Sequence, residues 1–248
     1  MSEEQIKRVD NAETLAEHRF KYFDFMMAAF VAILLCSNLI GAAKLVQFFD
    51  LNIGGVDIGV FGAGILFFPL SYVLGDVLTE VYGYARARRV VWTGFIAALF
   101  MSFMAFVVVA LPAAPGWEGQ EAYEEVFGLT PRIVFASMIA FWAGEMANAY
   151  VMARMKIWSQ GKHLWRRTIG STVVGQGVDS ILFYPIAFLG VWTTGQVFTV
   201  LVTNYVLKVL WEAILTPVTY KIVGALKRAE GVDIYDTSTD YSPFSIKA

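Results

Sequence analysis

Six apolar stretches, separated by short polar or charged segments, dominate the pattern of residues along the chain. A helix that spans a membrane needs about 20 consecutive, mainly apolar residues. The stretches that meet this length are Phe25–Phe48, Ile58–Thr79, Val90–Leu111, Arg132–Met152, Thr168–Val191 and Val197–Val223. We therefore predict an all-α, polytopic membrane protein with six transmembrane helices.

Polar residues of mixed charge precede the first stretch and follow the last one. The beginning of the chain lacks the apolar core and the small-residue cleavage site of a signal peptide. We expect residues 1–24 to form a cytoplasmic tail, with a short amphipathic helix as one alternative for its structure. Residues 25–225 would form the six-helix transmembrane domain, and residues 226–248 a second cytoplasmic tail.

The composition agrees with a membrane protein and excludes several other classes. Apolar residues make up 57% of the chain and charged residues only 16%, against roughly a quarter in soluble domains. The net charge of −2 and the lack of a basic face argue against nucleic-acid binding. With Cys36 as the only cysteine, and with two separated histidines, we expect no disulfide framework, metal site, cofactor or catalytic triad.

Lysine and arginine positions predict the orientation, because cytoplasmic loops of membrane proteins are enriched in these residues. Six crossings place most of the 19 basic residues on one side, in the two tails and in the loops after the second and fourth stretches. Acidic residues such as Asp50, Asp57 and Glu118 then lie on the opposite side. We expect a protein of the cytoplasmic (inner) membrane with both termini in the cytoplasm.

The acidic segment Pro112–Pro131 allows two interpretations. It is either a short helix that lies on the outer surface of the membrane or an ordinary solvated loop. We favour the loop, because runs of charge are usually solvated.

Two short motifs suggest an internal repeat. Leu66-Phe-Phe-Pro-Leu-Ser-Tyr72 in the second stretch resembles Leu182-Phe-Tyr-Pro-Ile-Ala-Phe188 in the fifth. Two inverted halves of three helices each are common in secondary transporters, and Pro69 and Pro185 would kink their helices. The alternative is a chance similarity between apolar, aromatic-rich segments.

Polar and charged residues interrupt the predicted spans at helical spacing. Asp76 and Glu80 are four residues apart, so they share one face of a continuous helix. Similar pairs and ladders recur in the fourth, fifth and sixth stretches: Glu145 and Asn148; Gln176 and Asp179; Asn204, Lys208 and Glu212. The first stretch contains Asn38 and, nearer the outside, Lys44. Because lipid cannot accept these groups, we expect the polar stripes to converge inside the bundle.

These polar stripes allow a structural and a functional interpretation. In the structural one they only hold helices together, with Lys208 paired to Asp179 or to Glu212. In the functional one they form a binding site, and the excess of acidic residues over lysines implies protonated carboxylates or a bound cation. Aromatic residues beside the stripes, Phe67, Tyr72 and Tyr184 among them, would stack on a planar ring.

The residues that carry this polar pattern resemble the queuosine precursor transporter family. The resemblance covers roughly residues 25–225. It rests on Ser37-Asn38, on the block from Phe68 to Gly83 with Asp76-Val-Leu-Thr-Glu80-Val-Tyr-Gly83, on Ser171-Thr-Val-Val-Gly-Gln-Gly-Val-Asp179-Ser180, and on Asn204-Tyr-Val-Leu-Lys208. It implies a six-helix transporter that takes up 7-deazaguanine bases, the nitrile preQ0 or the aminomethyl base preQ1.

Such a substrate suggests roles for the polar residues. A 7-deazaguanine ring presents N1–H and a 2-amino group side by side, and one carboxylate, from Asp179 or Glu145, would accept both. An aminomethyl cation would suit Asp76 or Glu80, while Lys208 would keep a carboxylate ionised in the empty site. The expected substrate-binding residues are Asn38, Phe67, Tyr72, Asp76, Glu80, Glu145, Asn148, Gln176, Asp179, Tyr184, Asn204 and Lys208.

Three other classes compete with a self-sufficient transporter. Substrate-binding subunits of energy-coupling-factor importers are also small six-helix proteins, and Ala28 and Ala32 have the spacing of their docking helix. A membrane-embedded, metal-dependent transferase would use Asp76, Glu80 and Glu145, but no known metal motif is present. A channel would need a repeated selectivity loop, which is not visible. The expected partners are a small-molecule base, membrane lipid and, as one alternative, a second copy of the chain.

Overall fold

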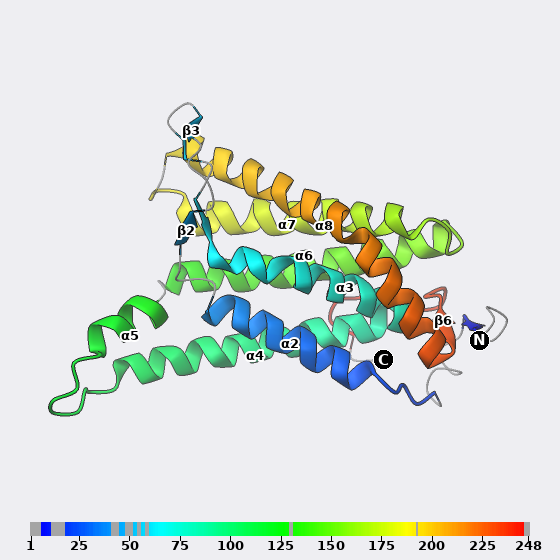
Figure 1. The fold of residues 1–248 in the computed structure, drawn as a ribbon, viewed down its shortest axis with the longest axis horizontal. Helices are drawn as coiled ribbons and strands as arrows, with labels where there is room; N and C mark the ends of the chain where they lie inside the picture. The colour runs from blue at the N-terminus through cyan, green and yellow to red at the C-terminus, as the bar shows by residue number, and fades with distance from the viewer. Residues whose placement is uncertain are drawn as a thin grey trace.

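Six long helices lie side by side along the longest axis of the computed structural model (Figure 1). The structure describes residues 6–10, 18–40, 45–47, 52–53, 56–57, 60–128, 131–191 and 193–245. The long helices are α2 (Phe23–Leu39), α3 (Phe68–Tyr82), α4 (Tyr84–Ala110), α6 (Pro131–Trp158), α7 (Leu164–Phe188) and α8 (Thr194–Glu230). Successive long helices run in opposite directions.

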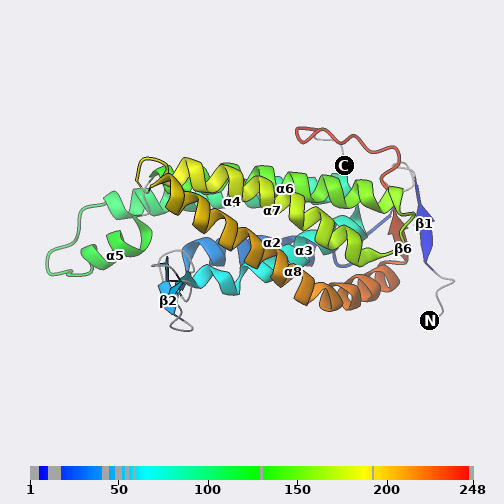
Figure 2. The same cartoon turned by 90° about the horizontal axis from the view of Figure 1, so that it is seen from above.

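Short elements mark the two ends of the bundle (Figures 1 and 2). One end, here named the hairpin end, carries helix α5 (Gln120–Phe127) and strands β2 (Leu45–Gln47), β3 (Asn52–Ile53), β4 (Val56–Asp57) and β5 (Val60–Gly62). Strand β2 pairs antiparallel with β5, and β3 with β4. The other end, the terminal end, carries strands β1 (Lys7–Val9) and β6 (Val232–Ile234), which pair in parallel.

Described segments near both ends of the chain, residues 6–10, 18–22 and 231–245, are part of the folded body at the terminal end. The Glu230 carboxylate, at the end of α8, accepts the backbone N–H groups of Lys21 and Tyr22 at 2.9 Å and so satisfies free donors at the start of α2. The carboxy-terminal segment lies along α4, where the Arg88 guanidinium donates to the carbonyl oxygens of Asp240 and Ser242 at 2.7 and 2.8 Å. These contacts hold both tails of the chain against the helices.

The surface of the bundle is apolar while much of its interior is polar. Phe100 and Phe106 on α4 and Ile214 on α8 are each about two-thirds exposed (64%, 67% and 64%). In contrast, Glu80 and Glu212 are fully buried. A soluble protein has the opposite distribution, so this surface is suited to lipid.

Three segments in the described part of the chain are long and apolar enough to cross a membrane: Tyr84–Ala110, a second within Gln120–Trp158, and Thr194–Glu230. Helices α2 and α3 have only 17 and 15 residues. Helix α7 is long, but its buried residues include Arg167, Gln176 and several Ser and Thr residues, which lower its hydropathy. The chain is therefore a mainly helical membrane protein.

The first two predicted spans are shorter as helices than the sequence suggested. Helix α2 ends at Leu39 instead of Phe48, and α3 begins at Phe68 instead of Ile58. The intervening sequence is rich in glycine, and each glycine costs a helix about 1 kcal/mol relative to alanine. Short strands occur there, so the expectation of an all-α fold is incomplete. Lys44 lies outside the described residues.

Two further expectations were wrong. Residues Gln120–Phe127 of the acidic segment form a helix and not only a loop. Pro69 sits in the first turn of α3, where its missing N–H removes no helical bond, so it starts this helix and does not kink it. Pro185 lies inside α7, in its last turn. The two resembling motifs therefore occupy different places in their helices, which does not support an inverted repeat built on them.

Helices α6 and α7 approach one another closely at a pair of glycines. A Cβ atom on Gly175 would lie 2.7 Å from the Asn148 Cβ and 2.9 Å from the Gly144 carbonyl oxygen. A Cβ on Gly144 would lie 2.9 Å from the Asp179 Cβ. Small residues thus allow the two backbones to meet and bring Asn148 and Asp179 to the same contact.

We predict that Gly175→Ala lowers the free energy of unfolding by about 1–3 kcal/mol, because the added methyl overpacks the contact between α6 and α7. Thermal unfolding of the purified protein in detergent measures the loss. Gly177→Ala is the matched control, since the nearest atom to its Cβ would be a ring carbon of Tyr205 at 3.8 Å. Equal stability of the two variants would contradict the close contact.

Candidate functional site

Four helices bring polar side chains together in the middle of the bundle. Asp76 on α3 is fully buried, and its Oδ1 accepts a hydrogen bond from the Asn148 Nδ2 on α6 at 2.9 Å. Gln176 and Ser180, from α7, are also buried. We name Asp76, Glu145, Asn148, Gln176, Asp179, Ser180, Lys208 and Glu212 the polar core. The convergence of polar stripes predicted from helical spacing is present here.

One ion pair lies at the more accessible edge of the polar core. The Lys208 Nζ on α8 is 2.7 Å from the Asp179 Oδ2 on α7, and the two side chains are 16% and 20% exposed. Lysine 208 therefore pairs with Asp179, which is one of the two structural alternatives considered above. The pair joins α7 to α8 and occupies one oxygen of the Asp179 carboxylate.

Several buried atoms of the polar core make no hydrogen bond. Among the described residues these are Asp76 Oδ2, Asn148 Oδ1, Gln176 Oε1, Ser180 Oγ and both carboxylate oxygens of Glu212. A buried polar atom without a partner costs about 1–3 kcal/mol. Such a group of atoms in one region is typical of a site that binds a polar ligand.

Glu145 on α6 lies between the ion pair and the unpartnered residues. Its carboxylate is close enough to Asp179, Lys208 and Glu212 to interact with their charges. Its Oε2 comes close to α3, 3.1 Å from the position of a Cβ on Gly75. A cavity of about 10 Å³ adjoins Glu145, which is room for about one water molecule. This cavity is too small for a larger ligand in this conformation.

The other expected site residues divide into two groups. Tyr72 and Tyr184 are buried, and Asp179 is close enough to interact electrostatically with each of them. Asn38 and Asn204 instead donate to the carbonyl oxygens of Leu34 and Val200 in their own helices. Phe67 lies just before α3 and is only partly buried. The structure gives the last three no contact with the polar core.

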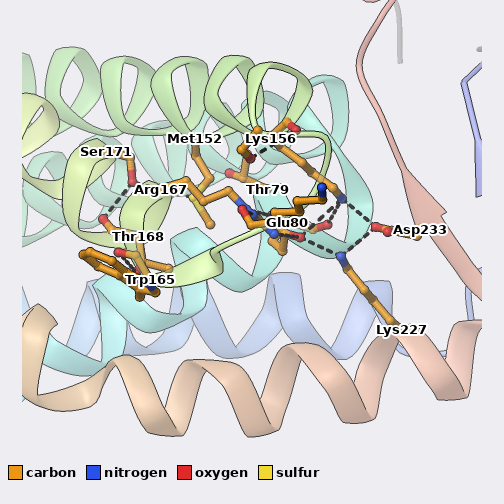
Figure 3. Close-up of polar contacts among 12 residues, drawn as sticks. Thr79, Glu80, Met152, Lys156, Trp165, Arg167, Thr168, Ser171, Lys227 and Asp233 are labelled. Atoms are coloured by element: carbon orange, nitrogen blue, oxygen red, sulfur yellow. Dashed lines mark hydrogen bonds and ion pairs between the residues drawn. The ribbon is translucent and has the colours of Figure 1, made fainter. Parts of the chain in front are cut away.

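Glu80 belongs to a separate cluster of charges at the terminal end (Figure 3). Its carboxylate accepts from Arg167 Nε and Nη2 at 2.7 and 2.8 Å, and Lys227 Nζ is 2.6 Å away. Lys156 Nζ lies 3.4 Å from Glu80 and 2.7 Å from Asp233, which Lys227 also contacts at 2.6 Å. We name these five residues the terminal cluster. Its three cations saturate Glu80, which therefore has no capacity left for a substrate cation.

The terminal cluster was missed at the sequence level because four of its members lie in segments expected to be loops or tails. Helix α6 continues past the predicted end at Met152 to Trp158, so Lys156 lies within it. Asp233 comes from β6. Burial raises the pKa of the Asp233 carboxyl, but Lys156 and Lys227 more than offset this and hold the pKa below its usual range. Its stabilising contribution is thus fully present at neutral pH and is lost only in strong acid.

A larger cavity of about 210 Å³ lies at the turn between α6 and α7, among Lys162, His163 and Arg166. It is lined by residues of the terminal end and by none of the polar core. This cavity is therefore not at the group of unpartnered atoms.

We predict that Glu80→Gln lowers the free energy of unfolding by about 3–5 kcal/mol. The substitution removes the carboxylate charge that all three buried cations contact, and Asp233 remains as the only carboxylate of the terminal cluster. Thermal unfolding in detergent measures this loss. Asp10→Asn is the control, since it breaks an exposed ion pair with Arg8 of 3.1 Å, and such pairs contribute at most about 1 kcal/mol. A loss no larger for Glu80→Gln than for the control would contradict this account of the cluster.

Known proteins share much of this sequence. Residues 62–222 match the family model described as "putative vitamin uptake transporter". The chain is 32% identical over 186 residues to the "probable queuosine precursor transporter" of Bacillus subtilis, which covers 75% of this chain and 77% of that protein. No solved structure matches it.

Two further relatives align over about half their length. The chain is 27% identical over 125 residues to the "queuosine precursor transporter" of Escherichia coli, covering 50% of this chain and 54% of the relative. It is 27% identical over 126 residues to the "probable queuosine precursor transporter" of Haemophilus influenzae, covering 50% and 51%. These names describe transporters and no enzyme, which removes the alternative of a membrane-embedded transferase. The chain belongs to the queuosine precursor transporter family.

Proposed function

We propose that this protein imports a queuosine precursor, a 7-deazaguanine base such as preQ0 or preQ1, across the cytoplasmic membrane. The names of the relatives supply the substrate class. The observation that carries the proposal is the set of buried, unpartnered polar atoms in the polar core. A purine-like base, with donors and acceptors around its edge, is the kind of ligand that would satisfy such atoms.

In this proposal all six long helices cross the membrane with both termini in the cytoplasm. The alternating direction of the helices and the apolar surface of α4 and α8 support it. Basic residues also gather at the terminal end, at the start of α4, at the turn between α6 and α7, and at the end of α8: Arg86, Arg89, Lys162, Arg166 and Arg228. Cytoplasmic loops are enriched in such residues, so the terminal end would face the cytoplasm.

Glu145 is the carboxylate that we assign to the substrate edge. Of the two candidates from the sequence, Asp179 already has Lys208 at 2.7 Å, whereas Glu145 adjoins the small cavity. A carboxylate there would accept the N1–H and 2-amino donors of the base together. Asn148 and Gln176 would then supply amide donors and acceptors, and Tyr72 would contact the ring face.

Transport would proceed by alternating access to the polar core. The closed cavity beside Glu145 requires helices to move before a bicyclic base can enter. The terminal cluster ties α3, α6, α7 and α8 together at the proposed cytoplasmic end, through Glu80 and its partners. Opening toward the cytoplasm would separate these ends, while opening toward the outside would leave the cluster intact.

We predict that preQ0 or preQ1 raises the melting temperature of the purified protein, because a ligand that binds only the folded state adds about 2.7 kcal/mol of stability at 100 times its Kd. Adenine, which lacks the paired N1–H and 2-amino donors, should give no shift.

Glu145→Gln should weaken binding of the base about tenfold or more, since a hydrogen bond to a charged group contributes about 1.5–3 kcal/mol.

The control for Glu145→Gln is Glu121→Gln on α5, a conservative change of an exposed residue outside the bundle. This variant should bind both bases like the parent protein. Absence of a shift with either base, in parent protein shown to be folded, would refute the proposed function. An undiminished shift in Glu145→Gln would refute only the assignment of that residue.

A further inference from the structure

Glu212 is a buried acid in the middle of α8 that the proposed substrate contacts do not use. Its side chain is fully buried, and neither carboxylate oxygen has a hydrogen-bond partner among the described residues. The nearest lysine along the helix, Lys208, has its Nζ on the Asp179 carboxylate at 2.7 Å. In the part of the chain that the structure describes, no ion pair joins Glu212 to a lysine or arginine.

A second acid faces Glu212 from the neighbouring helix. Asp76 on α3 is also fully buried, and Glu212 exerts the largest effect of any charged residue on it. The Asp76 Oδ1 accepts from Asn148, but its Oδ2 is unpartnered. Two buried acids on helices α3 and α8 thus interact, and three of their four carboxylate oxygens have no hydrogen-bond partner among the described residues.

The other titratable groups around the pair do not neutralise it. Tyr72, from α3, and Glu145, from α6, interact with Glu212 and carry no positive charge. Asp179 on α7 is another acid, and Lys208 on α8 is bonded to it. The groups that face Glu212 from its own and the adjoining helices are therefore mostly acidic.

Asp76 and Glu212 are not stable as two ionised carboxylates in the interior of the bundle. Both would lose their hydration, only Asp76 would gain a donor in return, from Asn148, and the two charges would repel one another at low dielectric. One added proton removes one charge and creates an O–H donor, which the other carboxylate can accept. This is the arrangement by which paired acids elsewhere share a proton.

We propose that Asp76 and Glu212 form a proton-binding pair and that one proton crosses the membrane with each substrate molecule. The inference rests on the proposed function. The proton enters from the outside when the polar core opens in that direction, and it binds one oxygen of the pair. After the core opens to the cytoplasm, the proton leaves to water together with the base. For neutral preQ0, each cycle moves one positive charge inward.

The test uses full-length protein in liposomes and two measurements with preQ0. The first is exchange of labelled against unlabelled preQ0 at equal pH on both sides, which reports transport without coupling. The second is net accumulation under a pH gradient of one unit, acid outside, with the membrane potential clamped at zero. Coupling to one proton predicts about tenfold accumulation, because one pH unit corresponds to a factor of ten.

Glu212→Gln should lose the accumulation of preQ0 driven by the pH gradient, since its amide cannot carry a transferable proton. Glu121→Gln on α5 should behave like the parent protein in both measurements. If Glu212→Gln does not fold, Asp76→Asn takes its place. The response of the parent protein to the gradient tests the proposal without any variant.

Each other outcome would overturn the proposal. A parent protein that exchanges preQ0 but ignores the pH gradient is not proton-coupled, and one that responds to a sodium gradient instead uses a different ion. Accumulation by Glu212→Gln equal to that of the parent would exclude the pair as the proton site. A parent protein that fails to exchange preQ0 at all would overturn the proposed function itself, and with it this inference.

Discussion

Lipid offers no hydrogen bonds to a polar side chain, and the arrangement of the whole bundle follows from this constraint. The outward faces of α4 and α8 carry large apolar residues such as Phe106 and Ile214. Charged groups in the middle of α3, α6 and α8, such as Asp76, Glu145 and Glu212, are buried, where only other protein groups can satisfy them. Each buried charge in this protein is therefore informative, because keeping it there without a partner costs several kcal/mol.

Two groups of buried charges differ in how completely they are satisfied. In the terminal cluster, Glu80 has three cations around it at 2.6–3.4 Å, so its role is to hold the ends of four helices together. In the polar core, Asp76 and Glu212 keep oxygen atoms without any partner. A saturated cluster stabilises one arrangement of the helices, whereas an unsaturated one has capacity left for a ligand or a proton. This contrast is the basis for assigning a structural role to the terminal cluster and for proposing a binding role for the polar core.

Much of the candidate site could be predicted from spacing alone. Asp76 and Glu80 lie on one helix, as their four-residue separation indicated. Their different roles could not be predicted, because the partners that decide them are distant in the chain. Asn148 is 72 residues from Asp76, Arg167 is 87 from Glu80, and Lys227 is 147 from Glu80. A helical pattern reports which face a residue occupies and does not report what packs against that face.

The sequence by itself determined that the chain is a helical membrane protein and that its polar stripes converge, because apolar length and helical periodicity are local properties of the chain. It also carried the family resemblance. Only the tertiary structure decided where α2 and α3 begin and end, that both tails fold back at the terminal end, and which acids remain without partners. Those features depend on contacts between segments far apart in sequence, and burial and pairing exist only once such segments have met.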